Sequence, residues 1–302
     1  KNYIKTKFDA FFRFYPTFWV KTNKIKDTID QYVVVKIIHN PNSMTIEGTI
    51  EKYIGLVGDI DIEDEVINCL ATSHWHRKID KMHYNEIGIS DIDLTPIRTD
   101  FTSIDEIISI DPQGSLDIDD ALSIQQISDN TYQIGIHIAD PSSFLIENSI
   151  LDKEVQNRTE SVYLKKNTIH MFNHTLSTDM FSLNSNRISR AFSVMIVFTY
   201  DENKIETQSI SVTKSLIKVK KNMTYEQVQN IVDKNDNDKN NNMLKILYKI
   251  GQYFYTNVLD PNNLINYDSK KMVEIFMILA NCITANKLIN GLTNKSYKDK
   301  II

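Results

Sequence analysis

The 302-residue sequence is poor in cysteine, proline and glycine, with only two, six and eight of these residues. Cys69 and Cys282 stand far apart and match no metal-binding spacing, so no disulfide framework is expected. This cysteine usage favours a reducing compartment, and we expect a cytoplasmic protein. No apolar run approaches the roughly 18 residues that a membrane span requires. The aromatic segment 8–20 is interrupted by charged residues and a proline, so neither a signal peptide nor a membrane partner is expected.

The motifs of several enzyme classes are also missing. The sequence contains no G-x-S-x-G, G-x-x-x-x-G-K-[S/T], G-x-G-x-x-G or H-E-x-x-H. Serine hydrolases of the elbow type, P-loop and dinucleotide-binding enzymes and zinc proteases therefore have no signal here. What remains is ordinary globular composition, with 41% apolar and 24% charged residues and a net charge of −5. At this length we expect two domains or one large one.

Residues 1–95 are expected to form a small antiparallel β-barrel. Short apolar strands are indicated over 18–22, 31–39 and 44–54. The first 36 residues contain eight Lys or Arg against three Asp, among many aromatic residues. On a barrel, such side chains grip single-stranded nucleic acid, because the charges follow the phosphates and the rings stack on bases. A solvated face over an aromatic core explains the same residues equally well.

The segment from residue 107 is expected to form a β-meander. Its strands are 107–111, 121–127 and 131–139, and Asp129-Asn130 supplies the last turn. In the third strand His137 lies on the face opposite the isoleucines. It is either a hydrogen-bonded structural histidine, which we favour, or a residue that approaches a site.

Beyond residue 200 the periodicity becomes helical. Thr224 and Gln227 match a capping box for a helix that begins there. Further helices are expected at 243–258 and at 271–290, and the last is apolar nearly all round and should be buried. The fold class is therefore α+β, with an OB-like (cold-shock-type) barrel over 1–95 and a mixed α+β domain over 96–302.

The most informative stretch places four aspartates within ten residues: Asp111, Asp117, Asp119 and Asp120. Clustered carboxylates raise each other's pKa, so a fold keeps such a cluster mainly when a cation neutralises it. Oxygen ligands suit Mg²⁺ first, with Mn²⁺ or Ca²⁺ as alternatives, rather than zinc. A solvated acidic loop competes with this interpretation, but it would not need the apolar strands that frame the aspartates. An EF-hand is excluded, because no glycine and glutamate stand at its sixth and twelfth positions.

Magnesium among several carboxylates is typical of phosphodiester hydrolysis, in which two ions act together. These aspartates and the segments around them resemble the catalytic domain of the ribonuclease II (RNB-domain) exoribonuclease family. The similar segments follow in order along the chain: 98–102, 110–122, 135–140, 158–164, Ser182-Leu183, 224–228, Val273-Glu274 and 277–281. The resemblance implies Mg²⁺-dependent or Mn²⁺-dependent 3′→5′ hydrolysis of single-stranded RNA to nucleoside 5′-monophosphates. The resemblance does not specify which partner proteins in RNA decay, if any, the chain would bind.

The resemblance also implies roles for individual residues. Asp111 and Asp120 would bind metal directly, Asp117 would support a metal or its water, and Asp119 would be the aspartate most critical to the chemical step. Tyr163 would stack on the 3′-terminal base. The other expected RNA contacts are Tyr225, Arg187, Arg190 and Glu274. Packing is an equal alternative for Tyr225, which lies on the apolar face of its predicted helix.

The sequence departs from the family pattern at several positions. Ile275 replaces the second glutamate of a V-E-E-x-M block, Ser189 stands where an arginine is usual, and 170–173 replaces a proline-containing block. No second aromatic residue to clamp the terminal base is evident, and the resemblance places the end of the chain inside the catalytic domain. A catalytically inactive RNA-binding module or pseudoenzyme is therefore the alternative function. A metal-dependent phosphodiesterase acting on DNA or small substrates is a third.

Overall fold

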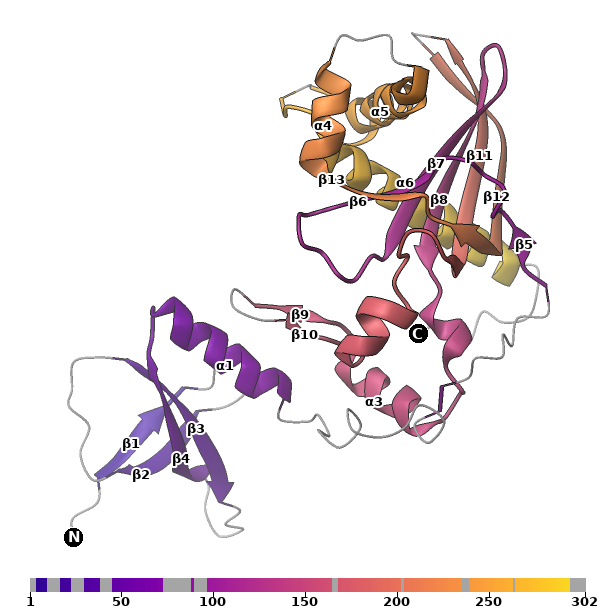
Figure 1. Cartoon of the computed structure of the whole chain (residues 1–302). Helices are drawn as coiled ribbons and strands as arrows, with labels where there is room; N and C mark the ends of the chain where they lie inside the picture. The colour runs from indigo at the N-terminus through magenta and orange to yellow at the C-terminus, as the bar shows by residue number, and fades with distance from the viewer. Residues whose placement is uncertain are drawn as a thin grey trace. The chain divides into compact units, whose positions relative to one another are not determined.

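The computed structural model describes residues 4–9, 17–22, 30–38, 45–72, 88–89, 97–164, 168–201, 204–234, 239–262 and 264–293 (Figure 1). The chain divides into two compact units, one formed by 1–81 with 153–171 and the other by 82–152 with 172–302. Helices and sheets occur in both units, so the predicted α+β class is confirmed.

The first unit contains a four-stranded sheet in the order β1-β2-β4-β3. Its strands are β1 (Ile4–Phe8), β2 (Phe18–Thr22), β3 (Gln31–Ile38) and β4 (Glu47–Leu56). β2 and β4 pair in parallel, whereas the other two pairs are antiparallel, so the prediction of a purely antiparallel arrangement is wrong. The chain between β2 and β4 carries β3, which makes this connection long enough for the crossover that a parallel pair needs.

Helix α1 (Ile60–Thr72) follows β4 and was not predicted. It packs closely on that strand at Gly55, where an added Cβ would lie 2.5 Å from the Ile62 Cδ1 atom. Only glycine allows this approach without displacing the Ile62 side chain. The remainder of the predicted N-terminal domain, residues 73–87 and 90–95, lies outside the described residues.

A series of short elements lies between residues 141 and 180 of the chain. They are α3 (Ile150–Arg158), the two-stranded pair of β9 (Val162–Tyr163) and β10 (Thr168–Ile169), the 3₁₀ turn η2 (Pro141–Phe144) and the π-helical turn η3 (Leu176–Met180). In α3 the Arg158 Nε atom lies 3.0 Å from Glu154 Oε1 in a buried ion pair. Arg158 also donates to the carbonyls of His170 and Met171, which ties the end of α3 to the segment after β10.

The second unit is built on a seven-stranded sheet in the order β13-β6-β7-β8-β11-β12-β5. Its strands are β5 (Thr99–Asp100), β6 (Ile107–Asp111), β7 (Asp120–Ser128), β8 (Thr131–Ala139), β11 (Ile188–Asp201), β12 (Lys204–Lys218) and β13 (Lys221–Thr224). The predicted meander of β6, β7 and β8 is confirmed. The expectation of helices beyond residue 200 is wrong for β12, a strand that pairs along most of its length with β11.

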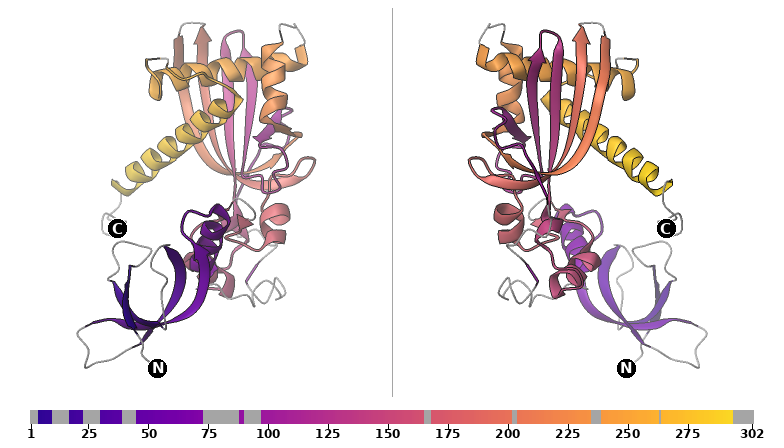
Figure 2. Two further views of the ribbon diagram at one scale, coloured as in Figure 1. Left: turned by 90° about the vertical axis from the view of Figure 1, so that its left-hand side faces the viewer. Right: turned by 90° about the vertical axis from the view of Figure 1, so that its right-hand side faces the viewer.

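Three helices cover one face of this sheet, α4 (Tyr225–Asp233), α5 (Lys239–Val258) and α6 (Ser269–Thr293). Figure 2 shows the long orange and yellow helices, α5 and α6, crossing the same side of the strands. Leu122, Ile134 and Val194 from the strands and Phe276 from α6 belong to the main hydrophobic core. The predicted capping box at the start of α4 is present, with Thr224 and Gln227 each bonding the other's backbone N–H.

Helix α6 is buried over its first half only. Met272, Ile275 and Phe276 are fully buried, whereas Leu288 and Ile289 are 61% and 57% exposed. The prediction of a wholly buried helix is therefore wrong for its second half. Residues 269–290 also reach the length and hydropathy of a membrane span, contrary to the prediction from the sequence, although a core helix meets the same criterion.

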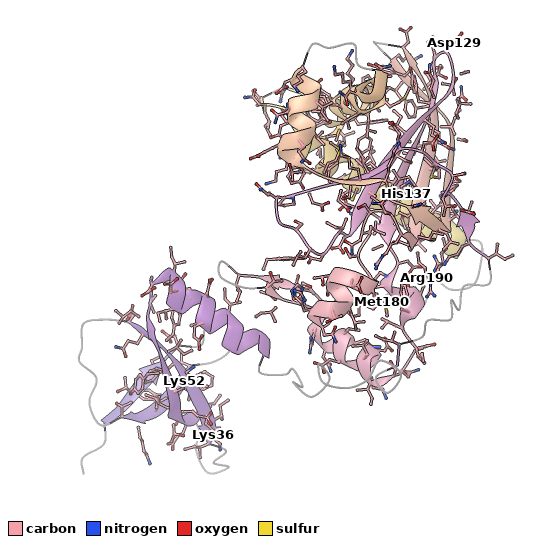
Figure 3. The ribbon with its side chains drawn as sticks, in the orientation of Figure 1. Lys36, Lys52, Asp129, His137, Met180 and Arg190 are labelled. Carbon is pink, nitrogen blue, oxygen red and sulfur yellow. The ribbon has the colours of Figure 1, made fainter. Side chains whose placement is uncertain are left out.

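The opposite face of the sheet contains a smaller core and a buried line of polar side chains that includes His137, which is labelled in Figure 3. The His137 Nε2 atom lies 2.9 Å from Ser123 Oγ, and its Nδ1 atom lies 2.7 Å from Ser193 Oγ. Ser193 Oγ in turn lies 2.6 Å from Ser215 Oγ. All four side chains are almost completely buried, and burial lowers the pKa of His137 to about 3. His137 is thus the structural histidine that the sequence favoured.

Candidate active site at the edge of the seven-stranded sheet

The four aspartates lie at one edge of the seven-stranded sheet. Asp111 is the last residue of β6 and Asp120 is the first residue of β7, and these strands are antiparallel neighbours. β13 pairs in parallel with β6 and places Thr224 opposite Asp111. Because all three strands reach the same edge here, the aspartate loop 112–119 and the start of α4 meet there.

Backbone contacts hold the loop on both sides of a buried residue, Ile118. The Ile118 N–H donates to Ser182 Oγ at 2.9 Å, and its carbonyl accepts from the Leu183 N–H at 2.8 Å. The Asp119 carbonyl accepts from the Ala139 N–H at 2.8 Å. Ile118 is therefore anchored inward, and the aspartates on either side of it are fixed in position at the sheet edge.

The aspartates perturb one another electrostatically. Desolvation, followed by the charge of Asp117, raises the pKa of Asp111, while a hydrogen bond from Ser109 opposes the rise. Partial desolvation and the charges of Asp117 and Asp111 raise the pKa of Asp119 to about 6. Desolvation and the charges of Asp111 and Asp119 raise the pKa of Asp120 to about 7. The causes of these three pKa shifts include no positively charged side chain, so no protein cation among the described residues offsets the negative charge of these aspartates.

The chemistry of this cluster fits a hard divalent cation. The Asp111 Oδ2 atom is buried and has no hydrogen-bond partner among the described residues, which is costly for a carboxylate unless an ion or water occupies that position. All candidate donors are carboxylate oxygens, as Mg²⁺ and Mn²⁺ prefer. Within the described ranges, however, no group of three or more His, Cys, Asp or Glu side chains is already arranged to hold a metal ion.

Tyr225 lies beside the aspartates. It is the first residue of α4, and its pKa is raised by desolvation and by the charges of Asp120, Asp111 and Asp268. The ring also packs against the main hydrophobic core. The sequence left open whether Tyr225 packs in the core or lies at the site. In the structure it does both.

Arg187 and Arg190 make contacts within the protein. Arg187 donates to Asp179 Oδ1 at 2.7 Å and to the Ser182 carbonyl at 2.8 Å, so it braces the turn that holds the aspartate loop. Arg190, at the start of β11 (Figure 3), donates to the Ser143 carbonyl and lies 4.0 Å from the Phe144 ring centroid. Their expected contacts with RNA remain predictions.

The remaining expected site residues are dispersed. Glu274 is exposed on α6 and its Oε2 atom lies 2.7 Å from Lys271 Nζ. Tyr163 belongs to β9 in the other compact unit, where it is 65% exposed. Ile275, where the family pattern has a second glutamate, is fully buried in the core, and the Ser189 hydroxyl is buried without a partner among the described residues.

Sequence reasoning did not assign a role to Ser182. It appeared only as part of a Ser-Leu pair similar to the family, yet its hydroxyl bonds the Ile118 N–H and the Leu116 carbonyl. It therefore holds the loop from which Asp117 and Asp119 extend. A serine pairing with a loop 64 residues earlier in the chain leaves no periodic signal in the sequence.

Comparison with known proteins identifies the family. Residues 98–296 match the model of the RNB domain. The chain is 28% identical to the probable exosome complex exonuclease RRP44 of Caenorhabditis elegans, over 92% of this chain and 32% of that protein. It thus spans about a third of the length of that relative.

Solved structures show a similar fold. RNase R of Mycoplasma genitalium in complex with ribose methylated single-stranded RNA has a TM-score of 0.68 at 20% identity, covering 92% of this chain and 48% of that one. Yeast Ssd1, described as a pseudonuclease, has a TM-score of 0.64 at 20% identity, covering 83% of this chain and 32% of that one. Since the RNB model matches more than half of the sequence, the chain belongs to the RNB domain family, whose relatives include exoribonucleases.

Proposed function

We propose that this chain carries the metal-binding part of an exoribonuclease that hydrolyses single-stranded RNA from the 3′ end with Mg²⁺ or Mn²⁺. The observation that carries the proposal is the cluster of Asp111, Asp117, Asp119 and Asp120 at one sheet edge, where burial and mutual charge raise the pKa of three of them. Family membership and the RNA-bound RNase R of similar fold support RNA as the substrate.

The aspartates would hold the metal, with Asp111 and Asp120 as direct ligands. When bound, the cations supply Lewis-acid stabilisation of the charge that develops on the phosphodiester oxygens. Asp117 and Asp119 extend from a loop whose backbone is held by Ser182 and Leu183. Asp119, the most exposed of the four, is proposed as the aspartate most critical to hydrolysis.

The RNA contacts are proposed from the surroundings of each residue. Tyr163 presents an exposed ring that can stack on the 3′-terminal base, and Tyr225 lies at the aspartates. Arg187, about a third exposed, braces the turn that holds the aspartate loop, and Arg190 packs on Phe144; both are proposed to lie along the RNA path, as is Glu274. We also propose that residues 1–95 form an OB-like RNA-binding domain and that 96–302 form the catalytic portion.

The decisive experiment is digestion of 5′-labelled single-stranded RNA with Mg²⁺, performed on this chain and on the longest natural polypeptide that contains it. A ladder that shortens from the 3′ end, stops with a chelator and disappears in Asp119→Asn while RNA binding persists would establish the activity. DNA of the same sequence, tested in parallel, separates a ribonuclease from a general phosphodiesterase. Loss of RNA binding together with activity in Asp119→Asn would refute the assignment of that residue.

A non-catalytic RNA-binding role is the second candidate function. The absence of a metal-ready group of side chains in the described part of the chain favours it, as do Ser189 and Ile275 at positions where the family pattern has charged residues. RNA binding without Mg²⁺-dependent cleavage in both polypeptides would support this role and exclude the exoribonuclease.

A further inference from the structure

Three lysines lie close together where the chain passes from β12 to β13: Lys218, Lys220 and Lys221, together called the lysine strip. We propose that the lysine strip binds phosphates of a single-stranded RNA whose 3′ end lies at the aspartate cluster. The inference rests on the proposed function, because it assigns the path that the rest of the same RNA strand takes away from the proposed cleavage site. None of the RNA contacts expected from the sequence lies within 218–221.

The segment that carries the lysine strip crosses from one side of the sheet to the other. β12 lies beside β5 at one end of the strand order, and β13 lies at the other end (Figure 1). Between them the chain covers the smaller core, in which Ile217 and Val219 are fully buried. The Val219 carbonyl accepts from the Asn186 N–H, and the Lys220 N–H donates to the Ile107 carbonyl, each at 2.8 Å. The backbone beneath the lysines is therefore fixed by both packing and hydrogen bonds.

The lysine side chains are exposed and lack acidic partners. Because successive side chains alternate along an extended chain, the burial of Ile217 and Val219 directs Lys218 and Lys220 to the surface. All three lysines of the strip are exposed. Across the described part of the chain none of them forms an ion pair, whereas three lysines elsewhere each contact a glutamate. Like charges this close repel one another, so the strip favours a polyanion as its occupant.

Strand register gives the position of the lysine strip relative to the aspartates. The parallel pairing of β13 with β6 places Lys221 opposite Ile108 and Thr224 opposite Asp111. Three residues of a strand span about 10 Å. The lysine strip therefore begins about that far from Asp111 along the sheet edge and continues away from the aspartate cluster.

The far end of the lysine strip meets Arg187, which is already proposed as an RNA contact. Ile188 pairs with Lys218 across β11 and β12, and the Asn186 N–H bonds the Val219 carbonyl, so Arg187 lies between two contacts with this segment. The Arg187 side chain remains about a third exposed although it pairs with Asp179. The lysine strip thus joins the aspartate edge to a cation that was assigned to RNA on separate grounds.

Charge complementarity favours RNA as the occupant. The chain has a net charge of −5, and the proposed cleavage site consists of four carboxylates, so phosphates beyond any bound metal need local cations of the protein. A lysine ammonium binds phosphate as a point charge and does not read the bases. Such contacts suit an RNA strand that must be held whatever its sequence.

The test is binding of a labelled mixed-sequence single-stranded RNA to the 302-residue chain, with a chelator present to prevent cleavage, over a series of salt concentrations. Replacing all three lysines of the strip by glutamine should weaken binding by about one to two orders of magnitude near 0.1 M salt. The slope of log affinity against log salt should fall by about 2, because each phosphate contact to a single strand contributes about 0.7. Replacing them by arginine keeps the charges and should retain both the affinity and the slope.

The matched control replaces by glutamine three exposed lysines on helices or at a helix end: Lys153, Lys234 and Lys249. It changes the net charge equally and should keep the wild-type slope. Equal losses in the two triple variants would overturn the lysine strip, because net charge alone would then explain the effect, and so would an unchanged slope in the lysine-strip variant. A wild-type chain that binds no single-stranded RNA would instead refute RNA as the substrate in the proposed function, and the strip with it.

Discussion

The seven-stranded sheet contains two polar clusters that differ in how their atoms are satisfied. In the line of Ser123, His137, Ser193 and Ser215 every side chain is buried and hydrogen-bonded, and the histidine is held neutral. At the sheet edge the aspartates are partly buried, charged and mutually repelling, and one oxygen of Asp111 lacks a partner. In the first cluster the hydrogen bonds offset the free-energy cost of burying polar groups. In the second cluster that cost is not offset until a ligand of opposite charge binds. That contrast separates a structural polar network from a site.

The sharpest way to test the structural cluster is to remove its central residue. His137→Ala should lower the free energy of unfolding by about 3 kcal/mol or more, because it leaves buried hydroxyls unpaired and a cavity in the sheet. Urea denaturation measures the change. His174→Ala, which removes an exposed histidine, should stay within about 0.5 kcal/mol of the wild type. Equal effects of the two variants would mean that the buried line does not stabilise the fold.

The pH dependence of stability provides a second test of the same cluster. The folded pKa of His137 is about 3 and the unfolded pKa is about 6.5, so between these values the unfolded state binds more protons. Its contribution to stability is therefore present above pH 6.5 and is lost as pH falls toward 3. From pH 6.5 to 4.5 the wild type should lose about 2–3 kcal/mol more than His137→Gln. Parallel pH profiles for the two proteins would contradict a buried neutral histidine.

The charged cluster should respond in the opposite direction. The pKa of Asp120 is raised from 3.8 to about 7, so between these pH values the folded state binds more protons than the unfolded state, and the stability that protonation provides is lost as pH rises through 7. At pH 8 with a chelator, Asp120→Asn should therefore raise the stability, by on the order of 1 kcal/mol. Thermal unfolding measures this, with Asp129→Asn in the β7–β8 turn as the control. Mg²⁺ should stabilise the wild type and not Asp120→Asn, and the reverse pattern would exclude Asp120 as a ligand.

The elements that the sequence predicted well are those with local signals. The alternation of β6 to β8, the Asp129-Asn130 turn and the capping box of Thr224 and Gln227 each depend on residues close in the chain. β12 was missed, because its exposed polar alternation over 204–213 lacks an apolar face as strong as those of its neighbours. The exposure of Leu288 and Ile289 was missed because composition reports how apolar a helix is, not whether other elements cover it.

The candidate site shows the same division. The four aspartates were found because they are adjacent in sequence, and their position at strand ends followed from the strands around them. Ser182 holds the loop between them from 64 residues further along the chain, so only the folded structure reveals this contact. Arg187 and Arg190 were assigned to RNA because they flank Ser189, where the family pattern has an arginine, whereas the structure shows the backbone carbonyls they bind.

Tyr163 tests whether substrate contacts extend beyond the aspartate cluster. Its ring is 65% exposed, whereas an aromatic side chain whose only role is packing is usually buried. If it stacks on the 3′-terminal base, Tyr163→Ala loses about 1–3 kcal/mol of base stacking, while the aspartates are unchanged. The length of the final oligonucleotide should therefore shift while cleavage continues, as read from a digestion ladder run to completion. Tyr163→Phe, which keeps the ring, should leave the end product at its wild-type length, and an unchanged end product in Tyr163→Ala would assign terminal stacking to another residue.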